Sequence, residues 1–127
     1  LPIADWAADL KAADLTGGTL VTAEYQLGGN LRYATRTRTV DADFPIHVYP
    51  PASPDNPSSQ ASDGGCVAVW RNVPLMPPKL DAYLRTVLGA DPGDGMPDAA
   101  FERPLLTTDD RMTVLYVRSL PVTTRCR

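Results

Sequence analysis

The chain has 127 residues, of which 43% are hydrophobic, and its formal net charge at pH 7 is −3. The length fits one domain over residues 1–127, and the hydrophobic content is typical of a folded globular chain rather than a disordered one. The acidic balance argues against nucleic acid as the main partner, because binding to phosphates requires a basic surface.

The first two predicted elements are a helix and a strand. Apolar residues recur at steps of three and four over Ile3–Leu15, which places them on one helix face, and Thr16-Gly17-Gly18 ends this helix. Thr19–Glu24 (TLVTAE) is short and rich in apolar and β-branched residues, which predicts a strand. A helix, two glycines and a strand together indicate the opening of an α/β layer.

A second helix is predicted directly after this strand, over Tyr25–Ala34 (YQLGGNLRYA), where leucine and alanine recur at helical spacing. Its two glycines, Gly28 and Gly29, each weaken an isolated helix by about 1 kcal/mol relative to alanine. We therefore expect these glycines to allow a close approach between this helix and a neighbouring element.

The middle of the chain is predicted to form two strands separated by a long loop. Phe44–Tyr49 (FPIHVY) is the first of these strands, and Cys66–Arg71 (CVAVWR) has the composition of a buried strand. Between them, residues 50–65 are rich in proline and serine and lack large apolar side chains, which predicts an exposed, mobile loop. A helix with a clean apolar stripe follows over Lys79–Leu88.

The C-terminal part is predicted to be a β-hairpin, with arms at Phe101–Leu106 and Arg111–Leu120. The element order predicts a three-layer α/β fold with a mainly parallel sheet of 4–5 strands and this antiparallel hairpin at its end. Three parallel strands are expected at 19–24, 44–49 and 66–71, joined by Arg111–Leu120, whose two largely apolar faces suit an interior strand. The side chains expected in the core are Trp6, Leu10, Val21, Leu31, Val48, Val67, Val69, Leu84, Val114 and Leu115.

The motifs of cofactor binding and catalysis are missing from the sequence. Gly28 and Gly29 lie too far beyond the end of their strand for a dinucleotide turn, and neither a GxGxxG nor a Walker A sequence occurs. His47 is the only histidine and lies inside a predicted strand, so we interpret it as a structural or surface residue. We therefore predict no cofactor, no metal site and no catalytic residue.

Two charged clusters have structural interpretations. The segment 32–38 carries three arginines, which we interpret as a solvated surface, with an anion site as the alternative. Asp91, Asp94 and Asp98 lie in a Gly/Pro-rich connection, but their spacing does not match a calcium-binding loop. Turn chemistry is the favoured explanation for these aspartates.

The chain has two cysteines, Cys66 and Cys126, and their spacing fits no metal motif. Cys66 opens an apolar strand, where a buried free thiol is the expected state. The alternative is a bridge to Cys126, which would tie down the C-terminal tail and would require an oxidising compartment.

One local arrangement is a candidate binding site. Ligands of open α/β sheets bind beyond the carboxyl ends of strands, where helix N-termini point, and strand 19–24 runs directly into a helix. An arginine there can meet an anion with two hydrogen bonds, and aromatic rings can contact a sugar or a lipid. Packing and helix capping are the alternative explanation. The candidate ligand-binding residues are Glu24, Tyr25, Gln26, Trp70 and Arg71, with Tyr49 at a neighbouring strand end.

Thr19–Ala34 (TLVTAEYQLGGNLRYA), after a helix with a tryptophan, resembles the C-terminal soluble region of bacterial membrane glycosyltransferases. These enzymes are relatives of the dolichyl-phosphate-mannose-protein mannosyltransferases and the aminoarabinose transferases. Phe44–Tyr49 and Arg111–Leu120 (RMTVLYVRSL) are similar to the later strands of such regions. The Pro/Ser-rich segment 50–65 departs from the family pattern.

The resemblance implies a parent enzyme that transfers a sugar from a polyprenyl-phosphate donor. In that family the catalytic acidic residues lie among the membrane helices, and no residue here matches them. The resemblance therefore implies a non-catalytic accessory domain on the extracytoplasmic, periplasmic face of a bacterial membrane. Its partners would be the membrane-embedded part of the parent enzyme and a lipid-linked sugar or acceptor.

The start of the sequence agrees with this expectation. The chain begins at Leu1 and contains neither a signal-peptide pattern nor an apolar run of the roughly 20 residues that a membrane-spanning helix requires. We therefore expect a domain cut from a longer protein. The alternatives are a free-standing secreted or periplasmic binding domain and, on fold analogy alone, a small cytosolic enzyme.

Overall fold

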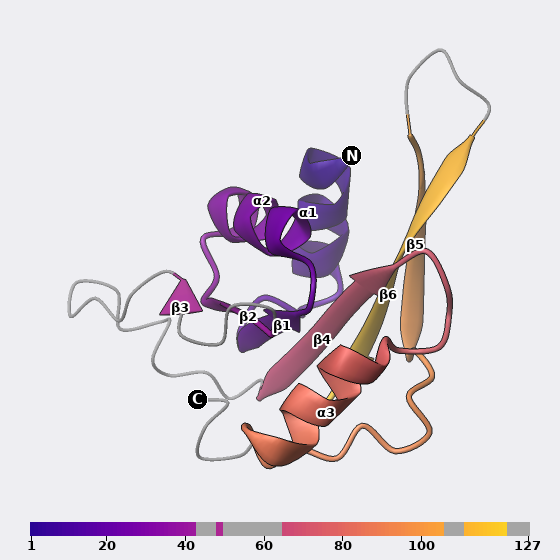
Figure 1. Cartoon of the computed structure of the whole chain (residues 1–127). Coiled ribbons are helices and arrows are strands. Elements are labelled where there is room, and N and C mark those ends of the chain that lie inside the picture. Colours follow the sequence, from indigo (N-terminus) through magenta and orange to yellow (C-terminus); the bar gives the residue numbers. More distant parts are fainter. Residues whose placement is uncertain (43–47, 50–64, 106–110, 122–127) are drawn as a thin grey trace.

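The computed structural model describes residues 1–42, 48–49, 65–105 and 111–121, with only the backbone at 48–49. Within these residues the fold is α/β, with three helices and one six-stranded mixed sheet (Figure 1). The elements are α1 (Ile3–Ala12), β1 (Thr19–Thr22), α2 (Tyr25–Thr35), β2 (Thr39–Asp41), β3 (Val48–Tyr49), β4 (Cys66–Arg71), α3 (Pro78–Thr86), β5 (Ala99–Pro104) and β6 (Met112–Ser119).

The sheet has the strand order β3-β2-β1-β4-β6-β5. Its centre is parallel, because β1 pairs in parallel with both β2 and β4. Its outer pairs are antiparallel: β3 with β2, β6 with β4, and β5 with β6. The carboxyl ends of β1, β2 and β4 therefore lie at one edge of the sheet, and α2 begins there, directly after β1.

Helices cover both faces of the sheet. Side chains alternate along a strand, so Leu20 of β1 faces α1 and α2, whereas Val21 faces α3. Figure 1 shows α1 and α2 together on one side of the sheet and α3 on the other. This two-sided burial explains why every residue of β1 and the first five residues of β4 are buried.

Helix α1 is fixed to the far edge of the sheet by two polar contacts. The indole nitrogen of Trp6 donates a hydrogen bond to the carbonyl of Phe101 in β5, at 3.0 Å. Asp9 accepts two hydrogen bonds from the guanidinium of Arg103, also in β5. The apolar face of α1 is buried through Trp6 and Leu10, which are both fully inaccessible.

The expectation of a mainly parallel sheet is correct only for its centre. Strand β1 has two parallel neighbours, β4 and β2 (Thr39–Asp41). The sequence pattern does not predict β2. From the expected strand 44–49 the structure describes β3, which runs antiparallel to β2, while residues 43–47 lie outside the described part. The expected arm 101–106 overlaps β5, which begins two residues earlier at Ala99, and the expected arm 111–120 contains β6, while residues 106–110 also lie outside the described part.

Most side chains expected in the core are buried, including Trp6, Val67, Val69 and Leu115. Val114 is only partly buried, and nothing is described for the side chain of Val48. Within the described stretches of chain, no helix has the length and apolar character needed to cross a membrane.

Candidate ligand-binding pocket beside α2

An open pocket of about 460 Å³ lies between α2 and β2. Ligand pockets in proteins commonly measure about 300 to 1,000 Å³, so this volume fits a small ligand. Helix α2 supplies most of the wall and β2 supplies the rest. The described residues that line the pocket are Tyr25, Gln26, Gly28, Gly29, Asn30, Arg32, Tyr33, Thr39 and Asp41.

Gly28 allows α2 to lie this close to the sheet. A Cβ atom at this position would lie 2.7 Å from Cγ2 of Thr22 in β1 and 3.6 Å from Cγ2 of Thr39 in β2. Thr22 is fully buried, and its hydroxyl accepts a hydrogen bond from the backbone N–H of Glu24. The expectation of a close approach is therefore confirmed for Gly28.

Gly29 has a different environment, although it is the next residue. No atom of the described residues lies within 4 Å of the position that its Cβ would take. A glycine is therefore not required at this position for packing against the described residues. Gly29 lines the pocket instead.

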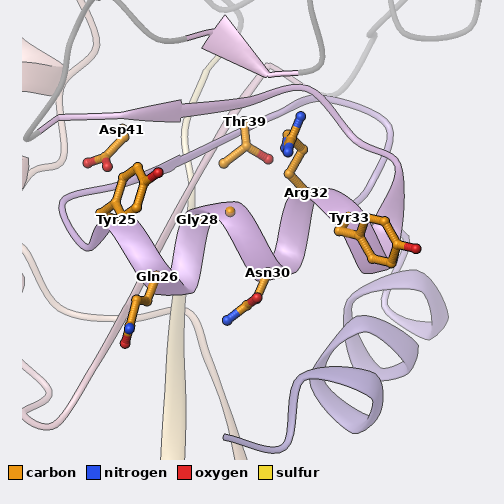
Figure 2. Close-up of a pocket in the computed structure, with 9 residues that line it drawn as sticks. Tyr25, Gln26, Gly28, Asn30, Arg32, Tyr33, Thr39 and Asp41 are labelled. Atoms are coloured by element: carbon orange, nitrogen blue, oxygen red, sulfur yellow. The ribbon is translucent and has the colours of Figure 1, made fainter.

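Two exposed tyrosines lie toward the two ends of the pocket. The side chains of Tyr25 and Tyr33 are 59% and 85% exposed. Figure 2 shows Tyr25 near the N-terminus of α2, below Asp41, and Tyr33 near the other end of the helix. Exposed tyrosine offers an apolar ring face and a polar hydroxyl together, which is a combination that favours binding.

Polar side chains complete the wall. Arg32 projects from α2 toward β2, where Thr39 and Asp41 lie, whereas Gln26 and Asn30 project from the side of α2 that faces away from β2 (Figure 2). The charge of Asp41 also acts on Tyr83 in α3. The pKa of Tyr83 is raised mainly by burial; the charge of Arg38 lowers it, and the charge of Asp41 raises it.

Two of the residues predicted for the strand-end site come together, but they bind each other. The guanidinium of Arg71 forms an ion pair with the carboxylate of Glu24 through both Nε and Nη2. The register of β1 and β4 explains this contact, since continuing the pair Val21 and Ala68 by three residues places Glu24 beside Arg71. Arg71 is thus engaged by Glu24, and the structure does not present it to an anion as we expected.

The other predicted residues divide between the pocket and the core. Tyr25 and Gln26 line the pocket. Trp70 does not reach it, because its ring is buried on the α3 side of the sheet and packs against Tyr116 with ring centroids 6.1 Å apart. The indole nitrogen of Trp70 donates to the carbonyls of Val73 and Pro74. No side chain is described for Tyr49.

The arginine segment 32–38 is not a uniform solvated surface. Arg36 is exposed and ends α2 in the left-handed conformation, with φ of 55°. Arg32 and Arg38 are partly buried, and Arg32 lines the pocket. From the sequence, Arg32 enters only within the alternative of an anion site at 32–38. Tyr33, Thr39 and Asp41 are not predicted as site residues, and the last two belong to the strand that the sequence does not predict.

The acidic connection forms turns, as the sequence predicts. Asp91 and Asp94 accept hydrogen bonds from the backbone N–H groups of Gly93 and Met96, two residues further on. The hydrogen bond from Met96 and the nearby charge of Arg118 lower the pKa of Asp94 below its ordinary value of 3.8. No group of three or more potential metal-ligating side chains occurs among the described residues. His47 lies outside them.

Cys66 is disulfide-bonded and is fully buried at the start of β4. The free thiol that we expected at this position is therefore wrong. The sequence holds one other cysteine, Cys126, whose placement is outside the described residues.

The comparisons with known proteins do not extend this description: no family model, no curated protein and no solved structure matches the chain.

Proposed function

We propose that this chain is the accessory domain of a membrane glycosyltransferase that uses a polyprenyl-phosphate sugar donor. In this proposal the domain binds the polar part of a lipid-linked sugar or of the acceptor, and it lies on the extracytoplasmic face of a bacterial membrane. The observation that carries the proposal is the pocket beside α2. It is lined by Tyr25, Asn30 and Tyr33, which belong to the segment that resembles this enzyme family.

The chemistry of the pocket supports binding. Its wall combines two aromatic rings with amide, carboxylate and guanidinium groups, which is the mixture that orients a small polar ligand. Acid–base chemistry would require a group within hydrogen-bond reach of the reacting atoms, and Asp41 is the only carboxylate among the described lining residues. The proposal therefore assigns binding to this domain and sugar transfer to the rest of the parent enzyme.

The state of Cys66 supports the extracytoplasmic location. Disulfide bonds form and persist in oxidising compartments such as the bacterial periplasm, and they are rare in the cytosol. Cys66 is disulfide-bonded here. A three-layer arrangement with a C-terminal hairpin formed by β5 and β6 remains part of the proposal, because helices lie against both faces of the sheet and these strands pair antiparallel.

The second candidate is a free-standing secreted or periplasmic binding domain, which the same pocket and the same disulfide favour equally. The full-length reading frame separates the two candidates. Upstream hydrophobic segments of membrane-spanning length would support the accessory domain. A signal peptide directly before Leu1, with no such segments, would contradict it and leave the free-standing binder.

The binding claim is tested by nuclear magnetic resonance titration of the 127-residue chain. The probe is a water-soluble, short-chain isoprenyl phosphate that carries a single mannose. We expect saturable shifts of backbone amides in α2 and β2. Shifts confined to other surfaces, or no shifts at millimolar probe, would overturn the assignment of the pocket.

A further inference from the structure

Gly29 is an unexplained residue in α2. Glycine weakens a helix interior, and sequences retain it there when a close contact or a special backbone conformation requires it. Gly28 meets that condition through Thr22, whereas nothing in the described structure lies within 4 Å of a Cβ on Gly29. Neither packing within the described residues nor a positive φ accounts for Gly29.

The position of Gly29 relative to the two tyrosines suggests a role. It lies four residues after Tyr25 and four residues before Tyr33, and residues four apart are neighbours on a helix surface. A larger side chain at this position would occupy the helix surface between the two tyrosines. The glycine therefore keeps the surface between Tyr25 and Tyr33 open, in a stretch of helix that lines the pocket.

The groups around this opening define the chemistry of a ligand. Tyrosine rings on either side offer apolar faces, and their spacing along the helix is about 12 Å, since eight residues rise by about 1.5 Å each. Arg32 follows Gly29 on α2 and Asp41 lies on β2, so a donor and an acceptor line the same pocket as the two tyrosines. A pyranose ring has an apolar face of C–H groups and hydroxyl groups at its rim, so it can make both sets of contacts.

We infer that one monosaccharide ring binds at Gly29, where it contacts the backbone of α2 between Tyr25 and Tyr33. The inference rests on the proposed function and deepens it, because it names the ligand as a pyranose and Gly29 as the residue that determines whether the ring fits. The free sugar and the sugar of a lipid-linked molecule share this chemistry, and the test separates these sources.

The experiment compares the parent chain with Gly29→Leu, which fills the opening with a residue of higher helix propensity. The matched control is Ala8→Leu, which adds a similar side chain to an exposed position of α1. Each protein is titrated with methyl α-mannopyranoside, with methyl β-glucopyranoside and with geranyl phosphate, and amide shifts of α2 and β2 are followed. Thermal unfolding is measured for all three proteins.

We expect at least one pyranoside to shift the amides of α2 and β2 in the parent and in Ala8→Leu. In Gly29→Leu, we expect its affinity to fall at least tenfold without a lower Tm. Equal pyranoside affinity in Gly29→Leu would overturn the role of Gly29 and leave the proposed binding function standing. Saturable shifts from geranyl phosphate alone would overturn the pyranose and likewise leave binding at this pocket. Failure of all three probes, together with the isoprenyl-linked mannose, would overturn both proposals.

Discussion

Gly28 and Gly29 are adjacent glycines with different surroundings: Gly28 lies against the sheet, whereas no described atom lies close to Gly29. From the sequence, both glycines predict a close approach, because a helix gives no local sign of which side meets a neighbour at these two positions. The structure assigns the close approach to Gly28, whose missing Cβ makes room for the methyl groups of Thr22 and Thr39. The two residues therefore form a natural matched pair for mutation.

We predict that Gly28→Ala destabilises the protein and that Gly29→Ala stabilises it. An added methyl group at Gly28 meets Thr22, whose position is fixed by burial and by its hydrogen bond to Glu24. Overpacking of this kind costs about 2 kcal/mol, and the gain in helix propensity returns about 1 kcal/mol, so a net loss of about 1 kcal/mol is expected.

At Gly29 the added methyl group meets no described atom, so only the gain in helix propensity remains, and the free energy of unfolding should rise by about 1 kcal/mol. Urea denaturation of both variants measures the two free energies of unfolding. Equal effects in the two variants would contradict the structural distinction between these glycines.

Trp70 and Arg71 show what the sequence could have revealed about the site. Neighbouring residues of a strand point to opposite faces, so this pair could not both face one ligand beyond the strand. That alternation was visible in the sequence and predicts the buried ring of Trp70. The ion pair between Arg71 and Glu24 was not visible, because it depends on which strand lies next to β1.

At the scale of elements, local pattern predicts the helices and most strands and fails for β2. The three helices, β1 and β4 are predicted because each helix has an apolar stripe and each of these strands is rich in apolar and β-branched residues. Strand β2 has only three residues, Thr39–Asp41, and it follows arginines that obscure its pattern. Missing β2 also left Thr39 and Asp41 out of the predicted site, whereas Tyr25 and Gln26, which were predicted as ligand-binding residues, line the pocket.

The connection between α3 and β5 is held by its own aspartates and by two arginines. Arg118 reaches Asp94 at 3.1 Å and the carbonyl of Met96 at 2.8 Å, and Arg85 reaches Asp91 at 3.1 Å. These contacts give the element a dependence on pH. A carboxyl group with a lowered pKa stabilises the folded state only while it is ionised.

We predict that Asp94→Asn lowers the stability of the protein at pH 7 and that this difference disappears in acid. The folded-state pKa of Asp94 lies below 3.8, so its contribution is fully present above pH 3.8 and is lost as the pH falls through the lowered pKa. Asparagine keeps an acceptor for the N–H of Met96 and removes only the charge. Thermal unfolding of both proteins between pH 7 and pH 2 measures the effect, and a difference that persists at pH 2 would contradict it.

At the scale of the whole molecule, the order of strands is the feature that local pattern cannot supply. Strand β6 lies between β4 and β5, so it separates two strands that are joined through α3. The two largely apolar faces of 111–120 predict an interior strand, but the preference for parallel neighbours around a connecting helix does not predict that this strand lies between β4 and β5. Pairing across the sheet is decided by contacts between residues far apart in sequence, which no short window contains.

We predict that reduction of the disulfide at Cys66 destabilises the whole domain. Opening a long covalent loop increases the entropy of the unfolded chain, and a loss of about 2 to 4 kcal/mol is expected. Denaturation with and without dithiothreitol measures this loss, and mass spectrometry of the non-reduced protein identifies the partner of Cys66. The double variant Cys66→Ala, Cys126→Ala is the control and should not respond to dithiothreitol. An oxidised protein no more stable than the reduced one would refute the prediction.

The central claim is that the pocket beside α2 binds the polar part of a lipid-linked sugar. Its most direct test is the dissociation constant of the mannose-carrying, short-chain isoprenyl phosphate for the parent chain and for Tyr33→Ala. Because Tyr33 is 85% exposed, its removal leaves the core intact, and an unchanged Tm verifies this. We expect the parent to bind the probe and Tyr33→Ala to bind it at least tenfold more weakly. Equal affinity in the two proteins would contradict the claim.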